Sequence, residues 1–199
     1  EVKKKLTNGR HRVIYHAHTT NTIALTFVLP LDDKVFTREL WESATECPVV
    51  FPDGVGVVGW MVPGGREIAV KTAELMKKYD VVIWAHHGMF CSGEDFDLTF
   101  GLLHTVEKSA EILVKVMSMA PRKLQTITPD DFRAVAKDFH VTLPNTHLSH
   151  GGRAFPCGLF YPGLSGCQLS EASDRAGYRC LPFQKIVDGH GVFPCHVCR

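Results

Sequence analysis

Val81-Val82-Ile83-Trp84 is the stretch that decides the fold class of this sequence. Four consecutive apolar residues rich in β-branched side chains are typical of a short strand that is buried on both faces. A segment with helical periodicity opens at Pro63-Gly64-Gly65 before this strand, and the longest amphipathic segment, residues 95–118, follows it. Because strands and helices alternate along the chain, we expect an α/β domain.

The remaining elements continue this alternation. Residues 12–16 are β-branched and aromatic and predict a strand, whereas residues 21–29 predict a helix with Asn21 as its N-cap and Pro30 as its end. The other expected elements are a helix at 36–44, strands at 49–51 and 55–58 around a Pro-Asp-Gly turn, and a helix that begins at Thr128-Pro129.

Length and composition indicate a globular chain of ordinary charge. Its 199 residues carry 22 basic and 21 acidic side chains, which gives no electrostatic support for binding to nucleic acid or to an anionic membrane. The sequence has no apolar run of about 18 residues, the length that a membrane span needs. Seven cysteines, an odd number, and an N-terminus without an apolar core lead us to expect a cytoplasmic protein without a disulfide framework.

The hydrophobic pattern of the sequence changes near residue 145. Up to that point helical and strand-like periods alternate, whereas residues 146–199 show no helical period longer than a turn and contain five of the seven cysteines. We expect residues 1–145 to form the domain and residues 146–199 to be an atypical, poorly ordered tail.

Two histidine motifs provide candidate metal ligands. His16 and His18 are two positions apart on a predicted strand, so their imidazoles project from the same face. His86 and His87 follow the strand at 81–84, and one of them could add a third nitrogen. Zinc with three protein ligands keeps a position open for substrate, which is typical of a catalytic site. Ordinary histidines at strand ends are the alternative, and spacing does not choose between His86 and His87.

Two further features carry weaker signals. Glu46, in Thr45-Glu46-Cys47, could move protons beside a metal ion, or it could be a solvated surface acid. Cys195-His196-Val197-Cys198 looks like half of a zinc knuckle, but it lacks a second pair at the required spacing. Neither feature establishes a site by itself.

An ordered series of motifs runs from about Arg10 to Val141. Its members are Val13-Ile14-Tyr15-His16-Ala17-His18, Thr45-Glu46-Cys47, Val50-Phe51-Pro52-Asp53-Gly54, Trp60-Met61-Val62-Pro63-Gly64 and His87-Gly88. This series resembles the class II (zinc-dependent) aldolases, and within them it is most similar to the rhamnulose-1-phosphate aldolases.

The resemblance implies a fold, a site and a reaction. The implied fold is class II aldolase-like, with a mixed, mostly antiparallel central sheet flanked by helices. The implied site has Zn²⁺ bound by His16, His18 and His87, with Glu46 as a catalytic residue. The implied reaction is the reversible cleavage of L-rhamnulose 1-phosphate to dihydroxyacetone phosphate and L-lactaldehyde, in rhamnose metabolism. Family members are cytoplasmic homotetramers that act on a small sugar phosphate, not on nucleic acid or membranes.

The chain departs from the family pattern at its start. The family's principal catalytic glutamate and phosphate-binding loops lie upstream of the His-x-His motif, so we expect an N-terminally truncated chain that is inactive as given. Two alternatives stay open. One is a related class II aldolase or a pentulose-phosphate 4-epimerase on the same fold, and the other is a non-catalytic metal-binding module, which would need no catalytic Glu46.

Overall fold

The computed structural model describes residues 1–120 and 123–148 of the chain. Within these residues, four strands form one sheet in the order β1-β4-β3-β2. The strands are β1 (Val13–Ala17), β2 (Val55–Val58), β3 (Val81–Trp84) and β4 (Gly88–Gly93). β4 pairs antiparallel with both β1 and β3, whereas β2 runs parallel to β3. The expected α/β class and the mixed, mostly antiparallel sheet are confirmed.

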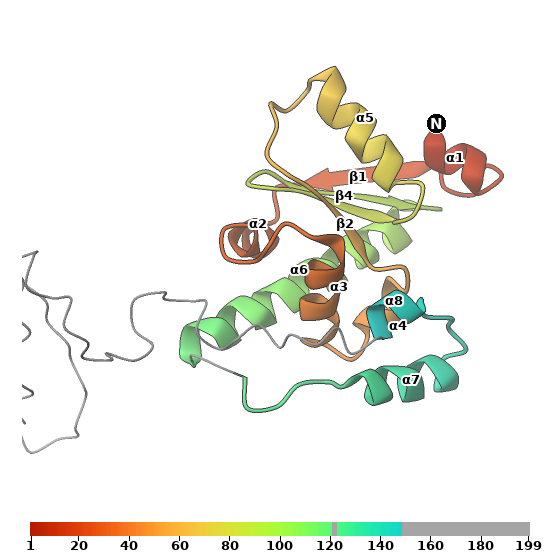
Figure 1. Cartoon of the computed structure of the whole chain (residues 1–199). Helices are drawn as coiled ribbons and strands as arrows, with labels where there is room; N and C mark the ends of the chain where they lie inside the picture. The colour runs from red at the N-terminus through yellow and green to blue at the C-terminus, as the bar shows by residue number, and fades with distance from the viewer. Residues whose placement is uncertain (121–122, 149–199) are drawn as a thin grey trace, which may run out of the picture. The chain divides into compact units, whose positions relative to one another are not determined.

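Helices flank both faces of this sheet. Figure 1 shows α5 on one side, and α3, α4, α6 and α7 on the other. None of the helices among the described residues is long and apolar enough to span a membrane. Their bounds are α1 (Val2–Leu6), α2 (Thr20–Leu25), α3 (Asp33–Trp41), α4 (Cys47–Val50), α5 (Arg66–Leu75), α6 (Phe96–Met119), α7 (Pro129–Asp138) and α8 (Asn145–Leu148).

The main core lies between the sheet and α6. The alternation of side chains along β1 turns Tyr15 toward this helix, where the centroid of its ring lies 6.0 Å from that of Phe100. The buried stripe of α6 includes Val106, Ala110 and Leu113, which are at most 1% exposed. Full burial of a valine or leucine side chain contributes about 1.5–3 kcal/mol, so this core holds the sheet firmly on α6.

The opposite face of the sheet is only partly covered. Ile68 of α5 packs there with Val82 and Trp84 in a smaller core. Toward β1 this face is open, and Ile14 is 56% exposed. An open groove of about 670 Å³ lies between α1, β1 and α5. Polar side chains on the outer face of β1 therefore remain accessible.

Several local features differ from the sequence-based expectation, among them the end of α2 at Leu25 instead of Pro30 and the unexpected helix α1. The strand predicted at 49–51 is wrong, because Cys47–Val50 form α4. Pro48 lies in the first turn of this helix, where a backbone N–H would have no helical acceptor, so proline is tolerated there. Asn21 lies inside α2, so its predicted role as the N-cap is also wrong. β4 was not expected, because its sequence, Gly-Met-Phe-Cys-Ser-Gly, has no β-branched residue. Pairing with β1 and β3 on both sides forms this strand.

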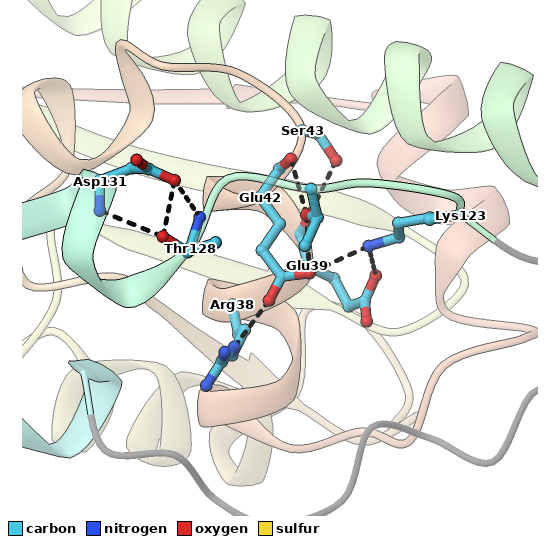
Figure 2. A network of polar contacts seen from close by, with 8 residues as sticks. Arg38, Glu39, Glu42, Ser43, Lys123, Thr128 and Asp131 are labelled. Carbon is cyan, nitrogen blue, oxygen red and sulfur yellow. Dashed lines mark hydrogen bonds and ion pairs between the residues drawn. The ribbon is translucent and has the colours of Figure 1, made fainter.

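A polar network ties the segment after residue 122 to α3 (Figure 2). The ammonium nitrogen of Lys123 lies 2.7 Å from Glu39 Oε2 and 3.2 Å from Glu42 Oε2. Further along, the side chain of Thr128 accepts from the backbone N–H of Asp131, and the Asp131 carboxylate accepts in return from the backbone N–H of Thr128. This capping box confirms Thr128 as the start of α7.

The packed body extends past the predicted boundary at residue 145. α8 begins at Asn145, and its residues His147 and Leu148 are buried in the described part of the chain. His147 Nε2 lies 3.1 Å from the carbonyl oxygen of Asp53. Residues 146–148 of the predicted tail therefore pack with the described domain, and the boundary itself stays a prediction. The rest of the predicted tail, including the motif at 195–198, falls outside the described residues.

Candidate metal centre

The first two histidines of the site come from the end of β1. Tyr15 and Ala17 pack against the main core, so the alternation of the strand places His16 on the opposite, accessible face. His18 follows the last residue of β1, and the centroids of its ring and of the His16 ring lie 5.2 Å apart. The predicted projection of both imidazoles from one face is what the structure has.

The third histidine lies in the turn between β3 and β4. Gly88, the first residue of β4, approaches the end of β1 so closely that an added Cβ would lie 2.2 Å from the carbonyl oxygen of Ala17. Gly88 also has a φ of +153°, a conformation that residues with a side chain rarely adopt. This close approach brings His87 up to His16 and His18.

The three imidazoles form a compact group. One ring nitrogen from each of His16, His18 and His87 lies within 4.8 Å of the others. Ligand nitrogens of a tetrahedral zinc lie about 3.3 Å apart, because each is about 2.0–2.1 Å from the ion. Small rotations of the rings would therefore bring the three nitrogens to ligand distance. In the described residues, this is the group of His, Cys, Asp and Glu side chains that could hold a metal ion.

His86 points into a different environment. Its backbone N–H donates to the Thr26 hydroxyl oxygen at 3.1 Å, its Nδ1 lies 3.2 Å from the same oxygen, and its ring contacts Phe27. The positive φ of His86, +62°, turns the chain so that adjacent histidines project in different directions. Spacing in the sequence could not show which of His86 and His87 joins the group. The conformation of the turn places His87 in it.

The surroundings prepare His16 to bind through a single nitrogen. Its Nδ1 lies 3.0 Å from the carbonyl oxygen of Met89, and since a carbonyl only accepts, Nδ1 carries the proton. The lone pair then lies on Nε2, and the hydrogen bond orients the ring in the way that is usual for metal-binding histidines. Phe90 stacks on the same ring with centroids 4.1 Å apart.

The electrostatics of the group favour neutral imidazole at His87. Partial burial lowers the pKa of His87, and the neighbouring imidazoles of His18 and His16 lower it further. A neutral imidazole has the free lone pair that a metal ligand needs.

Glu46 does not join this group. It is exposed and lies at the N-cap of α4, which packs against α6 and α7. Those helices lie on the side of the sheet opposite to α5 (Figure 1), whereas His16 faces the α5 side, near Trp84 and Phe90. Within one described chain, Glu46 therefore offers no carboxylate to the histidines, and its catalytic role stays a prediction.

Sequence reasoning missed two kinds of residue around the site. Trp84 and Phe90 form an aromatic wall beside His16, and the period-two pattern of their strands could have suggested it. Glu107 contacts Asn21 and Thr22, which follow His18 closely. No local signal marks Glu107, because it lies 86 positions from Asn21 and reaches it only through the fold.

Comparison with known protein families identifies the chain. Residues 7–114, more than half of the sequence, match the model of the class II aldolase and adducin N-terminal domain. The chain belongs to this family. The class II aldolases in the family are metal-dependent enzymes, which agrees with a histidine group able to hold a metal ion.

Two curated members of the family show high identity. The rhamnulose-1-phosphate aldolase of Mannheimia succiniciproducens is 57% identical over 141 residues, which cover 71% of this chain and 52% of that protein. The rhamnulose-1-phosphate aldolase of Klebsiella pneumoniae is 58% identical over 137 residues, which cover 69% of this chain and 49% of that protein. The predicted resemblance is confirmed, and the chain spans about half the length of the curated relatives it matches.

Solved structures of the family share the fold. The sugar-phosphate aldolase from Thermotoga maritima aligns with a TM-score of 0.54 at 30% identity, over 61% of this chain and 51% of that one. An L-fuculose 1-phosphate aldolase aligns with a TM-score of 0.50 at 22% identity, over 69% of this chain and 59% of that one. The second likeness supports the arrangement of elements alone.

Proposed function

We propose that this chain carries the metal-binding part of a zinc-dependent aldolase that cleaves L-rhamnulose 1-phosphate to dihydroxyacetone phosphate and L-lactaldehyde. The observation that carries the proposal is the convergence of three imidazoles from β1 and the β3–β4 turn in a family of metal-dependent aldolases. Identity of 57–58% to rhamnulose-1-phosphate aldolases supports this substrate over that of other family members.

The donor set fits a catalytic zinc ion. His16, His18 and His87 supply three nitrogen ligands, which leaves a coordination position open for the substrate. When bound, such an ion would polarise a substrate carbonyl and stabilise the negative charge that carbon–carbon cleavage leaves behind. Three imidazoles also suit other divalent metals, so zinc is the proposed ion and metal analysis of the purified protein decides.

The residues of the chain would prepare this chemistry in three ways. His16 is oriented by the carbonyl oxygen of Met89, so its ring need not reorganise to bind. Trp84 and Phe90 shield one side of its ring from water. Glu46 lies across the sheet from these histidines within one chain, so it is proposed to move the proton of the substrate hydroxyl at the site of a neighbouring subunit of the proposed homotetramer. The remaining expectations, a cytoplasmic location and a homotetramer, are part of the same proposal.

A non-catalytic metal-binding module is the second candidate. It is favoured by one observation, that the described residues bring no carboxylate into the histidine group. Such a module would bind metal, but it would release no dihydroxyacetone phosphate.

Metal content tests the proposed ligands. The purified chain should contain about one zinc per molecule, and His16→Ala and His87→Ala should each lose it. His86→Ala is the matched control, since His86 is adjacent to a ligand but contacts Thr26 and Phe27 instead. Retention of zinc in both His16→Ala and His87→Ala would contradict the proposed metal centre.

Product release separates the aldolase from the module. The zinc-loaded chain, extended at its N-terminus to the length of its curated relatives, is incubated with L-rhamnulose 1-phosphate or L-fuculose 1-phosphate, and dihydroxyacetone phosphate is measured by its coupled reduction. Preference for the first substrate supports the proposal, and preference for the second favours a related aldolase. Zinc binding without product from either favours the module. In an active protein, Glu46→Gln should lower turnover and leave zinc content unchanged.

A further inference from the structure

Helix α2 connects the two parts of the candidate metal centre. Its first residue, Thr20, follows His18 by two positions. The next residue after its end, Thr26, accepts a hydrogen bond from the backbone N–H of His86, directly beside His87. The separation between His18 and His87 therefore depends on where α2 lies, in addition to the pairing of β1 with β4.

The N-terminus of α2 is capped from a distant part of the chain. Thr19, at the N-cap position, makes no side-chain capping bond, and its buried Oγ1 has no partner in the described residues. Glu107 of α6 takes over this role. Its Oε1 accepts from the backbone N–H and the side-chain amide of Asn21, both at 2.8 Å, and its Oε2 accepts from the backbone N–H and the hydroxyl of Thr22 at 3.0 and 2.7 Å.

Glu107 sits on a rigid support. Its neighbours on α6, Val106 and Ala110, are fully buried in the main core. The carboxylate lies at the positive end of the α2 dipole, and both of its oxygens accept two bonds. Glu111, one turn further along α6, instead pairs with the exposed Lys108 and Lys115.

We propose that Glu107 is a positioning residue of the metal centre, which anchors α2 so that the nitrogens of His18 and His87 stay within reach of one ion. The inference rests on the proposed metal centre and goes beyond it, because Glu107 is not itself a ligand. Removing the carboxylate frees four donors at the start of α2 and releases the segment that follows His18. Metal affinity then falls because the ligands must be ordered at the moment of binding.

The test compares two helix caps in the full chain. Glu107→Ala removes the cap of α2, and Thr128→Ala removes the cap of α7, a helix whose main contact is with α4. Glu107→Gln is paired with Glu111→Gln, which loses the same charge from the same helix. For each variant, the Zn²⁺ dissociation constant is measured by competition with a chromophoric chelator. The visible absorption of the Co²⁺-loaded protein and the unfolding midpoint of the metal-free protein are recorded alongside.

The expected results distinguish positioning from plain stabilisation. Glu107→Ala should raise the Zn²⁺ dissociation constant about tenfold to a hundredfold and weaken the tetrahedral Co²⁺ absorption. Glu107→Gln should lie between it and the wild type, because the amide keeps one acceptor oxygen. Thr128→Ala should lower the unfolding midpoint without changing the dissociation constant, and Glu111→Gln should change neither by much.

Three results would overturn the inference. Unchanged Zn²⁺ affinity in Glu107→Ala, or in Glu107→Gln if the alanine variant does not fold, makes Glu107 an ordinary capping residue. An equal loss of affinity in Thr128→Ala shows that general destabilisation is responsible. Both of these results leave the metal centre standing. Absence of Zn²⁺ binding by the wild-type chain overturns the metal centre and the positioning role together.

Discussion

Gly88→Ala is expected to separate the start of β4 from the end of β1, and with it His87 from His16. The added Cβ would lie 2.2 Å from the carbonyl oxygen of Ala17 and 3.1 Å from its carbonyl carbon. Both of these atoms belong to the backbone, so no side-chain rotation relieves the overlap. The φ of +153° at Gly88 adds strain, because a residue with a Cβ rarely adopts it.

The size of the effect follows from these two terms. A side chain held in a sparsely populated backbone region costs about 1–3 kcal/mol. Moving the strand end to relieve the overlap weakens at least one ladder hydrogen bond, which contributes about 1 kcal/mol net. We expect the free energy of unfolding to fall by about 3 kcal/mol. The thermal midpoint should then fall by about 6–12 °C, at about 2–4 °C per kcal/mol for a chain of this size.

Gly101→Ala provides the matched control. An added Cβ at Gly101 meets no atom within 4 Å, and the residue lies inside α6. Alanine should therefore stabilise the helix by about 0.5–1 kcal/mol. Thermal unfolding of the metal-free proteins and zinc content after dialysis are measured for both variants. A Gly88→Ala protein that unfolds at the wild-type temperature and keeps its zinc would refute the close approach as the cause of the histidine geometry.

Three further predictions concern the body of the domain. Leu113→Ala should lower the free energy of unfolding by about 2–5 kcal/mol, because Leu113 is 1% exposed in the main core; a loss below about 1 kcal/mol in chemical denaturation would argue against that packing. Burial raises the pKa of the Cys47 thiol to about 12 and also raises that of Cys91, so peptide mapping after alkylation of the native protein at pH 8 should find both unmodified, and rapid labelling of either would contradict their burial. Hydrogen bonds from Thr128 lower the pKa of Asp131 below its ordinary value of 3.8. The stabilisation from that carboxylate is therefore present above about pH 3.8 and is lost as the pH falls through the lowered pKa, so the stability difference between the wild type and Asp131→Asn should shrink there, and a constant difference would contradict the capping box.

Local patterns were sufficient for the elements whose stabilisation is local. The apolar run at Val81–Trp84 became a fully buried strand, and the amphipathic stripe at 95–118 became α6 with nearly the same bounds. Thr128 capped α7 because its partner, Asp131, lies three residues away. For the two helices, the interactions that form the element join residues within one or two turns. The strand needs β2 and β4 as partners, but its continuous apolar run already marks it as buried.

Elements that depend on distant partners were predicted poorly. β4 has no β-branched residue and exists because β1 and β3 pair with it from both sides. The helical state of Cys47–Val50 could not be told from a strand, since four apolar residues are compatible with either. The cap of α2 was assigned to Asn21, because nothing near it in the sequence reveals Glu107.

For the candidate site, the sequence by itself determined the residue types and the shared face of His16 and His18, because the period of a strand is a local property. It also determined the family, because the motifs and their order along the chain can be recognised without knowing the fold. Spacing left His86 and His87 open and the family resemblance favoured His87, but only the tertiary structure brings the three imidazoles together. It alone also places Glu46 away from the group and reveals that Glu107 holds α2. The physical reason is that these facts depend on the approach of Gly88 to Ala17 and on the packing of α2 against α6, which are contacts between segments far apart in the chain.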